Sequence, residues 1–406
     1  MYKGLPKSIY ILFVARIINA LGNFVYPFLT IFLTDKLGIG HSAAGVFVTS
    51  AALATVPGAL VGGKLADVIG RKKVMVIAQA LAAVCFIPCA FLGKSRIIPY
   101  LLILSGTFNG AVVPANTAMV TDLTNENNRK STFSLLYLGT NIGFAVGPLI
   151  AGYLYNNYIN VLFLGNAAAI FISLILIIIF VKETMPCNNK IKEMHMNKKS
   201  NEKAEEGSLV RVLLKRPGLV AFALICALYS FVHAQCAFTT PLQVKSLFGT
   251  EGPKLYGSLM TVNGIVIVFM TTIITVATKK ISPIINVTIG GLFFAAGFGM
   301  LYFSRYYILF IVSTVIWSCG EILYATNSGV YIASHTPITH RARFNSIIPL
   351  IGSAGYALAP IIMGWYLKYN AIRTAWVLVF IAALTATVLM FILHIIEKSK
   401  IKEGKL

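Results

Sequence analysis

Twelve long apolar segments constrain the fold of this chain more than any other feature of its sequence. Each is long enough to cross about 30 Å of hydrocarbon as an α-helix. The segments are Ile9–Leu33, Ala43–Leu65, Val74–Leu92, Ile97–Val120, Phe133–Leu154, Val161–Val181, Leu219–Val244, Tyr256–Thr278, Ile284–Phe303, Tyr306–Ala333, Phe344–Leu367 and Ala375–Ile396. Of the 406 residues, 57% are hydrophobic and 12% are charged, about half the charged fraction of a soluble protein. The sequence therefore predicts an all-α membrane protein with twelve transmembrane helices.

The net charge of +21 is explained by membrane topology. Most of the 34 Lys and Arg residues lie in the two termini and in the even-numbered connections between segments. Cytoplasmic loops carry such an excess, so both termini are predicted to be cytoplasmic. The same dispersal over loops excludes a nucleic-acid-binding protein, which would gather its basic residues in one domain.

One polar stretch divides the chain into two halves of six segments each. Residues Lys182–Arg216 are Lys-rich and poor in aromatic residues, which is typical of a flexible linker. We therefore predict an N-terminal six-helix bundle at 1–181, a cytoplasmic linker at 182–216 and a C-terminal six-helix bundle at 217–406.

The two halves repeat one another in sequence. Residues Asn128–Leu154 align without a gap with residues His340–Tyr366, and the matched pairs include Arg129 with Arg341, Gly143 with Gly355, Pro148 with Pro360 and Gly152 with Gly364. Parallel repeats of this kind are typical of transporters, whose binding site lies between the halves near the middle of the membrane.

Two motifs carry a resemblance to a known family. The stretch "GGKLADVIGRKKV" (Gly62–Val74) resembles the signature of the major facilitator superfamily, and "GFAVGPLIAG" (Gly143–Gly152) is similar to the Gly-Pro motif of its antiporters. The stretch Met119–Phe133 further resembles bacterial multidrug–proton antiporters. The chain departs from that group in having no Arg in the fourth helix, so the nearest intramembrane base is Arg16 in the first.

The resemblance implies two pseudo-symmetric bundles and a set of gate residues. It implies that Asp67 pairs with Arg71 and with a helix end of the other half, as a cytoplasmic latch. It also suggests that Asp122 exchanges protons. The predicted cytoplasmic gate comprises Gly63, Asp67, Gly70, Arg71, Lys72 and Arg129, and the antiporter motif comprises Gly143, Gly147, Pro148 and Gly152. The alternative readings are an ordinary solvated loop and simple helix packing.

Polar stripes at helical spacing predict the substrate cavity. Helices one, four, seven and ten line the cavity in the family that the chain resembles. The predicted cavity residues are Arg16, Asn19, Asn23, Tyr26, Asn109, Tyr229, His233, Trp317 and Tyr324. The alternative is that these groups only form hydrogen bonds between helices, which polar groups in lipid require in any case.

Glu321 is the one acid of the 13 that lies deep in an apolar segment. Burial in a membrane favours the neutral form of a carboxyl group, so such a residue can take up and release a proton as its access to water changes. The repeat places Asn109, which is neutral, at the equivalent position of the first half. We therefore predict that Glu321 couples transport to protons, the alternative being a structural acid.

These observations predict a proton-coupled antiporter that exports amphipathic, often cationic compounds. The alternatives are a dedicated carrier of one metabolite or lipid-like molecule, for which Arg16 would hold an anionic group, and a membrane sensor without transport. The sequence leaves open whether sodium replaces the proton. We expect no enzyme activity, metal or cofactor, since no catalytic or ligand constellation stands out. We expect a multi-pass monomer of the plasma (bacterial inner) membrane that contacts lipid, protons and a small-molecule substrate.

Overall fold

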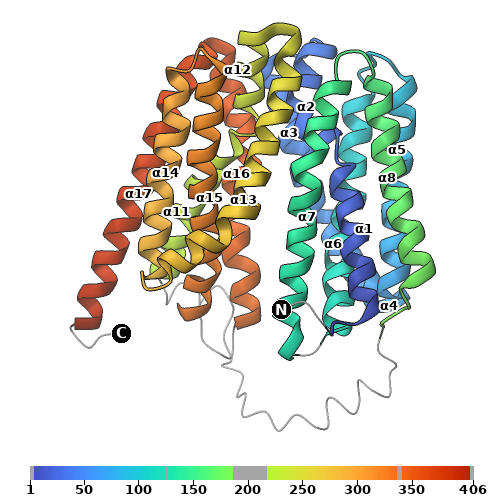
Figure 1. Cartoon of the computed structure of the whole chain (residues 1–406), viewed down its shortest axis with the longest axis horizontal. Helices are drawn as coiled ribbons and strands as arrows, with labels where there is room; N and C mark the ends of the chain where they lie inside the picture. The colour runs from blue at the N-terminus through green and yellow to red at the C-terminus, as the bar shows by residue number, and fades with distance from the viewer. Residues whose placement is uncertain (1–3, 125, 186–216, 336–340, 403–406) are drawn as a thin grey trace. The chain divides into compact units, whose positions relative to one another are not determined.

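A computed structural model describes residues 4–124, 126–185, 217–335 and 341–402. The chain divides into a first unit, Met1–Lys199 with Val244–Gly264, and a second unit, Ser200–Gln243 with Ile265–Leu406. The first unit contains α1 (Lys7–Leu21), α2 (Val25–Ile31), η1 (Phe32–Lys36), α3 (His41–Leu53), α4 (Thr55–Ile69), α5 (Arg71–Phe91), α6 (Ile98–Asp122), α7 (Glu126–Leu154), α8 (Ile159–Phe180) and the start of α13 (Gly252–Thr278). Within it, α1 packs on α7 and α8, and α5 packs on α6 and α8 (Figure 1).

The second unit is built in the same way from helices that pack in pairs. Its elements are α11 (Pro217–Ala234), the first half of α12 (Thr239–Phe248), the end of α13, α14 (Pro283–Gly299), η3 (Met300–Tyr302), α15 (Tyr307–His335), α16 (Arg341–Tyr369) and α17 (Ile372–Lys402). The second half of α12 and the short η2 (Gly249–Glu251) belong to the first unit. Here α14 packs on α15 and α17, and α11 packs on α16 and α17. The described residues contain helices and no strand, as the all-α prediction requires.

Eleven stretches among the described residues are helical, long and apolar enough to span a membrane. One of them, Pro217–Thr278, has 62 residues and contains α11, α12 and α13. A single crossing needs only about 20 residues. The seventh and eighth predicted segments both lie in that stretch, so the count of twelve crossings stays a prediction, as does the side on which the termini lie.

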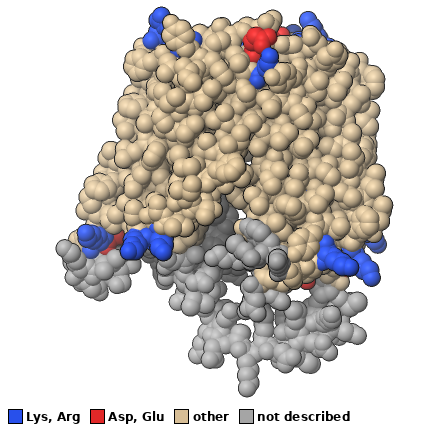
Figure 2. Space-filling model, viewed as in Figure 1, with Lys and Arg blue, Asp and Glu red and all other residues tan. Residues whose placement is uncertain are grey.

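The surface of the helices matches a lipid environment. On the face in Figure 2, uncharged residues cover the middle of the helices, and Lys, Arg, Asp and Glu show near the helix ends. Large apolar side chains such as Leu60, Phe91 and Phe269 are more than two-thirds exposed. In water this exposure would be costly, whereas in hydrocarbon it is the expected arrangement.

Two predicted segments are interrupted by breaks that prolines explain. Segment Ile9–Leu33 divides into α1 and α2, and segment Ala43–Leu65 divides at Ala54. A proline ring clashes with the carbonyl group four residues earlier and has no N–H to donate. For Pro27 that carbonyl belongs to Asn23, between α1 and α2, and for Pro57 it belongs to Leu53, the last residue of α3. The predicted polar stripe of the first helix therefore runs across a break.

Close helix contacts explain the glycines of the predicted antiporter motif. A Cβ atom on Gly143 would lie 2.6 Å from Ala20 and from the Ile17 carbonyl oxygen of α1, and Gly147 also faces α1. Further along α7, a Cβ atom on Gly152 would lie 2.6 Å from the Pro253 carbonyl oxygen. The α7 helix therefore packs tightly against both α1 and the start of α13.

The grouping of α13 differs from the predicted division at residue 217. Gly257 in the first half of α13 approaches the carbonyl group of Pro148, and Phe28 packs edge-on against Tyr256 with ring centroids 5.3 Å apart. These contacts place Val244–Gly264 with the first unit. The predicted linker lies outside the described residues beyond Met185.

Candidate functional site

Glu321 and His233 form a pair inside the second unit. Glu321 lies midway along α15 and His233 lies one residue before the end of α11. His233 Nε2 is 3.5 Å from Glu321 Oε2, and the two side chains are 26% and 23% exposed. The sequence predicts a role for each of these residues but not their contact.

Aromatic rings surround this pair. The His233 ring centroid lies 5.8 Å from those of Phe294 and Trp317 and 6.2 Å from that of Tyr356. Trp317 stacks in turn on Phe298, with centroids 5.5 Å apart. The carboxylate and the imidazole therefore share a setting of low polarity, where their interaction is stronger than in water.

Three of the predicted cavity residues, Trp317, Tyr229 and Tyr324, belong to the same aromatic cluster as His233. Tyr229 is 1% exposed and its hydroxyl group donates to Thr387 Oγ1 at 3.3 Å, while Trp317 is 2% exposed. Tyr324 packs against Tyr229 with ring centroids 6.0 Å apart. Their part in binding a substrate stays a prediction, because in this structure Tyr229 and Trp317 are almost fully buried.

The pair has the chemistry of a proton site. With a neutral imidazole and an ionised carboxylate its net charge is −1, and one added proton brings the net charge to zero, whichever group receives it. Removing this charge within an apolar helix bundle lowers the desolvation cost of the site. Among the described residues, no group of three or more His, Cys, Asp or Glu is placed to hold a metal ion.

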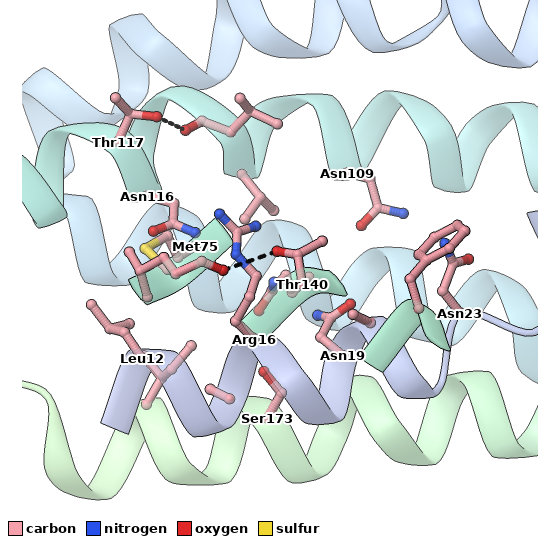
Figure 3. Close-up of a pocket in the computed structure, with 18 residues that line it drawn as sticks. Leu12, Arg16, Asn19, Asn23, Met75, Asn109, Asn116, Thr117, Thr140 and Ser173 are labelled. Carbon is pink, nitrogen blue, oxygen red and sulfur yellow. Dashed lines mark hydrogen bonds between the residues drawn. The ribbon is translucent and has the colours of Figure 1, made fainter. Parts of the chain in front are cut away.

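A second polar site is a cavity of about 310 Å³ inside the first unit. Figure 3 shows Arg16 extending from α1 into the space that Asn116 and Thr140 also line. Its polar lining residues are Arg16, Asn19, Asn23, Gln79, Asn109, Asn116, Thr117, Thr140 and Ser173. Four predicted cavity residues therefore meet in one cavity: Arg16, Asn19, Asn23 and Asn109.

The remaining predicted residue of the first helix lies elsewhere. Tyr26 lies in α2, after the break between α1 and α2. Its hydroxyl group donates to the Leu102 carbonyl oxygen at 3.3 Å, and it does not line the cavity. Sequence reasoning missed Gln79 of α5 and Ser173 of α8, which are isolated polar residues in apolar segments. It also missed Asn116, although a spacing of seven residues from Asn109 puts both on one face of α6.

A polar cluster joins three helix ends of the first unit. Arg71 Nε lies 3.2 Å from Asp122 Oδ2, and the Thr184 hydroxyl group donates to the same oxygen at 3.2 Å. Glu183, just past α8, accepts hydrogen bonds from the backbone N–H groups of Arg71 at 2.9 Å and Lys72 at 3.1 Å. The segment after α8 is thereby held against the start of α5.

Glu183 acts as a cap for α5, whose first N–H groups have no partner within the helix. Its carboxylate also accepts from the backbone N–H groups of Thr184 and Met185. Burial opposes ionisation of this carboxyl group, but the four N–H donors outweigh it and hold the pKa of Glu183 below its usual value. Sequence analysis did not predict this contact, because Glu183 is more than a hundred residues from Arg71.

The predicted gate residues are placed only in part. Gly70 has φ +106° at the turn before α5, and Gly63 faces the Pro114 ring of α6. Lys72 Nζ donates to the Ile178 carbonyl oxygen at 2.7 Å. Arg71 pairs with Asp122 and also donates from Nη1 to the Ala66 carbonyl oxygen at 3.2 Å, whereas the side chains of Asp67 and Arg129 lie outside the described residues.

A further set of contacts lies at the opposite end of the helices in the first unit. Lys245 Nζ is 3.2 Å from Asp35 Oδ1, and Lys36 Nζ donates to the Asn156 carbonyl oxygen at 3.1 Å. The Asn156 amide group donates to the Thr250 carbonyl oxygen. These contacts tie η1 and the end of α7 to the segment that precedes α13.

The chain is similar to a known protein family and to several of its members. A model of the Major Facilitator Superfamily matches residues 12–296 and 251–405 of the chain. The chain is 25% identical over 373 residues to the uncharacterized MFS-type transporter YttB of Bacillus subtilis (strain 168), covering 91% of this chain and 90% of the relative. It is 23% identical over 361 residues to a Na(+), Li(+), K(+)/H(+) antiporter of Planococcus maritimus, covering 83% and 84%.

A solved structure shares the fold. The crystal structure of a POT family transporter in complex with 5-aminolevulinic acid matches with a TM-score of 0.78 at 15% sequence identity, covering 97% of each chain. At this identity the likeness concerns the fold alone.

Proposed function

Because the chain belongs to the major facilitator superfamily, and is therefore a multi-pass membrane transporter and not an enzyme, we propose that it exports amphipathic compounds in exchange for protons. The observation that carries this proposal is the contact between His233 and Glu321. It joins two titratable side chains of apolar helices in a setting where gaining one proton changes the net charge. The antiporter of Planococcus maritimus, by its name, exchanges cations for protons.

In the proposed cycle, the Glu321–His233 pair takes up a proton from the outer side and releases it on the cytoplasmic side. A compound that enters from the cytoplasm or the inner leaflet favours the deprotonated form, and its binding shifts the population toward the state that opens outward. The aromatic rings near the pair suit an apolar body, and a cationic group would gain from both the carboxylate and the rings. The proposed location is the plasma (bacterial inner) membrane.

The cluster around Arg71 is the proposed cytoplasmic gate. Its ion pair with Asp122, and the cap that Glu183 forms on α5, hold three helix ends of the first unit together. Asp122 is 25% exposed and therefore reachable by protons from water. We propose that its protonation weakens the pair with Arg71 and helps the gate to open.

A second candidate function is a dedicated carrier of one anionic metabolite. The cavity around Arg16 favours it, because a cation there suits an anionic group. The two candidates share the proton site and differ in the substrate.

The test is transport in proteoliposomes under an imposed pH gradient, with ethidium as a lipophilic cation and a pH-sensitive dye in the lumen. Wild type should accumulate ethidium against its gradient and release protons in exchange, whereas Glu321→Gln should support only downhill movement. Glu251→Gln, an exposed acid at 63% exposure, is the matched control and should behave as wild type. Uphill transport by Glu321→Gln at the wild-type rate would refute the coupling role.

A further inference from the structure

We propose that the cavity around Arg16 is a binding site for an anionic group, carboxylate or phosphate, carried by an amphipathic ligand. This inference rests on the proposed function only in assuming that the chain binds amphipathic compounds. It adds a charge preference to the proposed function, and it concerns the first unit alone.

The charge of the cavity is the first argument. Arg16 is the one ionised residue among the described lining residues, which include no Asp or Glu. The described part of the chain gives Arg16 no hydrogen bond or ion pair, and the ion pairs found in the first unit lie at helix ends. The exposed guanidinium group of Arg16 is therefore available to an anion that enters the cavity.

Arg16 lies well inside α1 along its length, and its side chain is exposed to the open space of the cavity. It lies nine residues after Lys7, the first residue of α1, which corresponds to about 13 Å along the helix. The lining residues of the first span run from Leu12 in α1 to Asn23 just after it, so Arg16 is near the middle of this side of the cavity. Lys7 occupies the interfacial position of that helix instead.

The hydrogen-bonding groups around Arg16 complete the site. A guanidinium group presents five N–H donors in a planar fork that matches a carboxylate or phosphate group. The side-chain amides of Asn19, Asn23 and Asn116 add further donors within the same cavity. Gln79 is 8% exposed and its Oε1 has no partner among the described residues, so it suits a hydroxyl or N–H group next to the anionic group.

The rest of the lining and the size describe the ligand body. The apolar lining residues include Leu12, Met75, Val112, Phe144 and Ile177. A cavity of about 310 Å³ is at the lower end of the range for small-molecule sites. The fit is therefore a small ring or short chain with one anionic end, and not a bare inorganic ion.

The test compares two probes of nearly equal shape, the anionic naphthalene-2-carboxylate and the neutral naphthalene-2-carboxamide. Their affinity for the full chain is measured by equilibrium dialysis in nanodiscs of neutral phosphatidylcholine. Wild type should bind the carboxylate at least tenfold more tightly than the carboxamide. Arg16→Gln should remove this preference, and Arg16→Lys, which keeps the charge without the planar fork, should retain part of it. Arg96→Gln removes an exposed loop cation as the matched control and should change nothing.

Equal binding of the two probes to wild type, absence of carboxylate binding, or a preference that survives in Arg16→Gln would overturn the proposal. If Arg16→Gln does not fold, protection of Arg16 in wild type from phenylglyoxal, read by peptide mass spectrometry, replaces it: the carboxylate should protect and the carboxamide should not. Protection by both probes alike would refute the site.

Two further comparisons separate the possible causes. Discs that contain phosphatidylglycerol show the source of the anion. If this lipid competes with the carboxylate for wild type, the occupant of the anion site is a lipid headgroup. If it does not compete, the occupant is a soluble ligand. Because binding in discs needs neither a pH gradient nor transport, its failure leaves the coupling role of Glu321 untouched. Failure of the Glu321→Gln transport test likewise leaves this site intact.

Discussion

Replacing Gly143 with Ala should destabilise the protein by forcing α1 and α7 apart. The added Cβ atom would lie 2.6 Å from Ala20 Cβ, the Ile17 carbonyl oxygen and the Leu21 nitrogen, whereas ordinary contacts begin at 3.4 Å. Two of these three atoms belong to the backbone and cannot rotate away. The helices must therefore separate locally by about 0.8 Å, and overpacking of this kind costs about 1–3 kcal/mol.

Gly329 provides the matched control for Gly143. It lies within α15 and a Cβ atom there would meet nothing within 4 Å. Ala is favoured over Gly inside a helix by roughly 0.5–1 kcal/mol, so Gly329→Ala should leave stability unchanged or raise it slightly. The two substitutions make the same chemical change and are expected to have opposite signs.

The cysteines of the chain provide the assay. Cys85, Cys89, Cys226 and Cys236 are buried, so a thiol-reactive fluorophore reports their exposure as each unit unfolds on heating. A Cys187→Ser, Cys319→Ser background removes the other two cysteines. With roughly 2–4 °C per kcal/mol, Gly143→Ala should lower Tm by roughly 2–12 °C. A Tm for Gly143→Ala equal to that of Gly329→Ala would refute the argument from helix contact.

Two further predictions concern the ends of the first unit. Glu183→Gln should lower stability at neutral pH by about 0.5–2 kcal/mol, because it removes a charged cap from α5. The pKa of Glu183 is lowered in the folded protein. The cap therefore contributes fully above the ordinary Glu pKa of about 4.3 and is lost as the pH falls through the lowered value. Tm measured against pH should show the variant and wild type converging only in acid, and a constant difference would contradict the capping role. At the other end, Asp35→Lys should lower Tm by placing two cations near each other, and adding Lys245→Asp should restore most of the loss, because the 3.2 Å pair is then re-formed with its charges exchanged. Additive losses in the double variant would show that the pair contributes nothing.

Local sequence patterns predicted most of the helices, because spans in lipid depend on length and apolar composition. The breaks at Asn23 and Ala54 were not predicted, although Pro27 and Pro57 mark them. Membrane helices often tolerate proline, so the sequence does not say whether a given proline bends a helix or ends it. The neighbouring helices decide this: Phe24 N donates to Asn166 Oδ1 of α8 at 3.2 Å, which satisfies a group that the break frees.

The candidate sites were predicted as sets of residues but not as contacts. Spacing showed that Arg16 and Asn19 share a face of α1, whereas the addition of Gln79 and Ser173 depends on how α5 and α8 are rotated about their axes. His233 and Glu321, which form a pair, are 88 positions apart in the sequence. Side-chain partners at such separations follow from packing of whole helices, which no local pattern records.

The break between α1 and α2 divides the first span into two helices with different contacts. The α1 helix carries Arg16 and packs closely on Gly143 and Gly147 of α7, whereas Phe28 of α2 packs on Tyr256 of α13. At the joint, Pro27 has no N–H to bond to the Asn23 carbonyl group, so flexing there ruptures no helical hydrogen bond of that residue. The first span can therefore bend between α1 and α2 at little cost in hydrogen bonding.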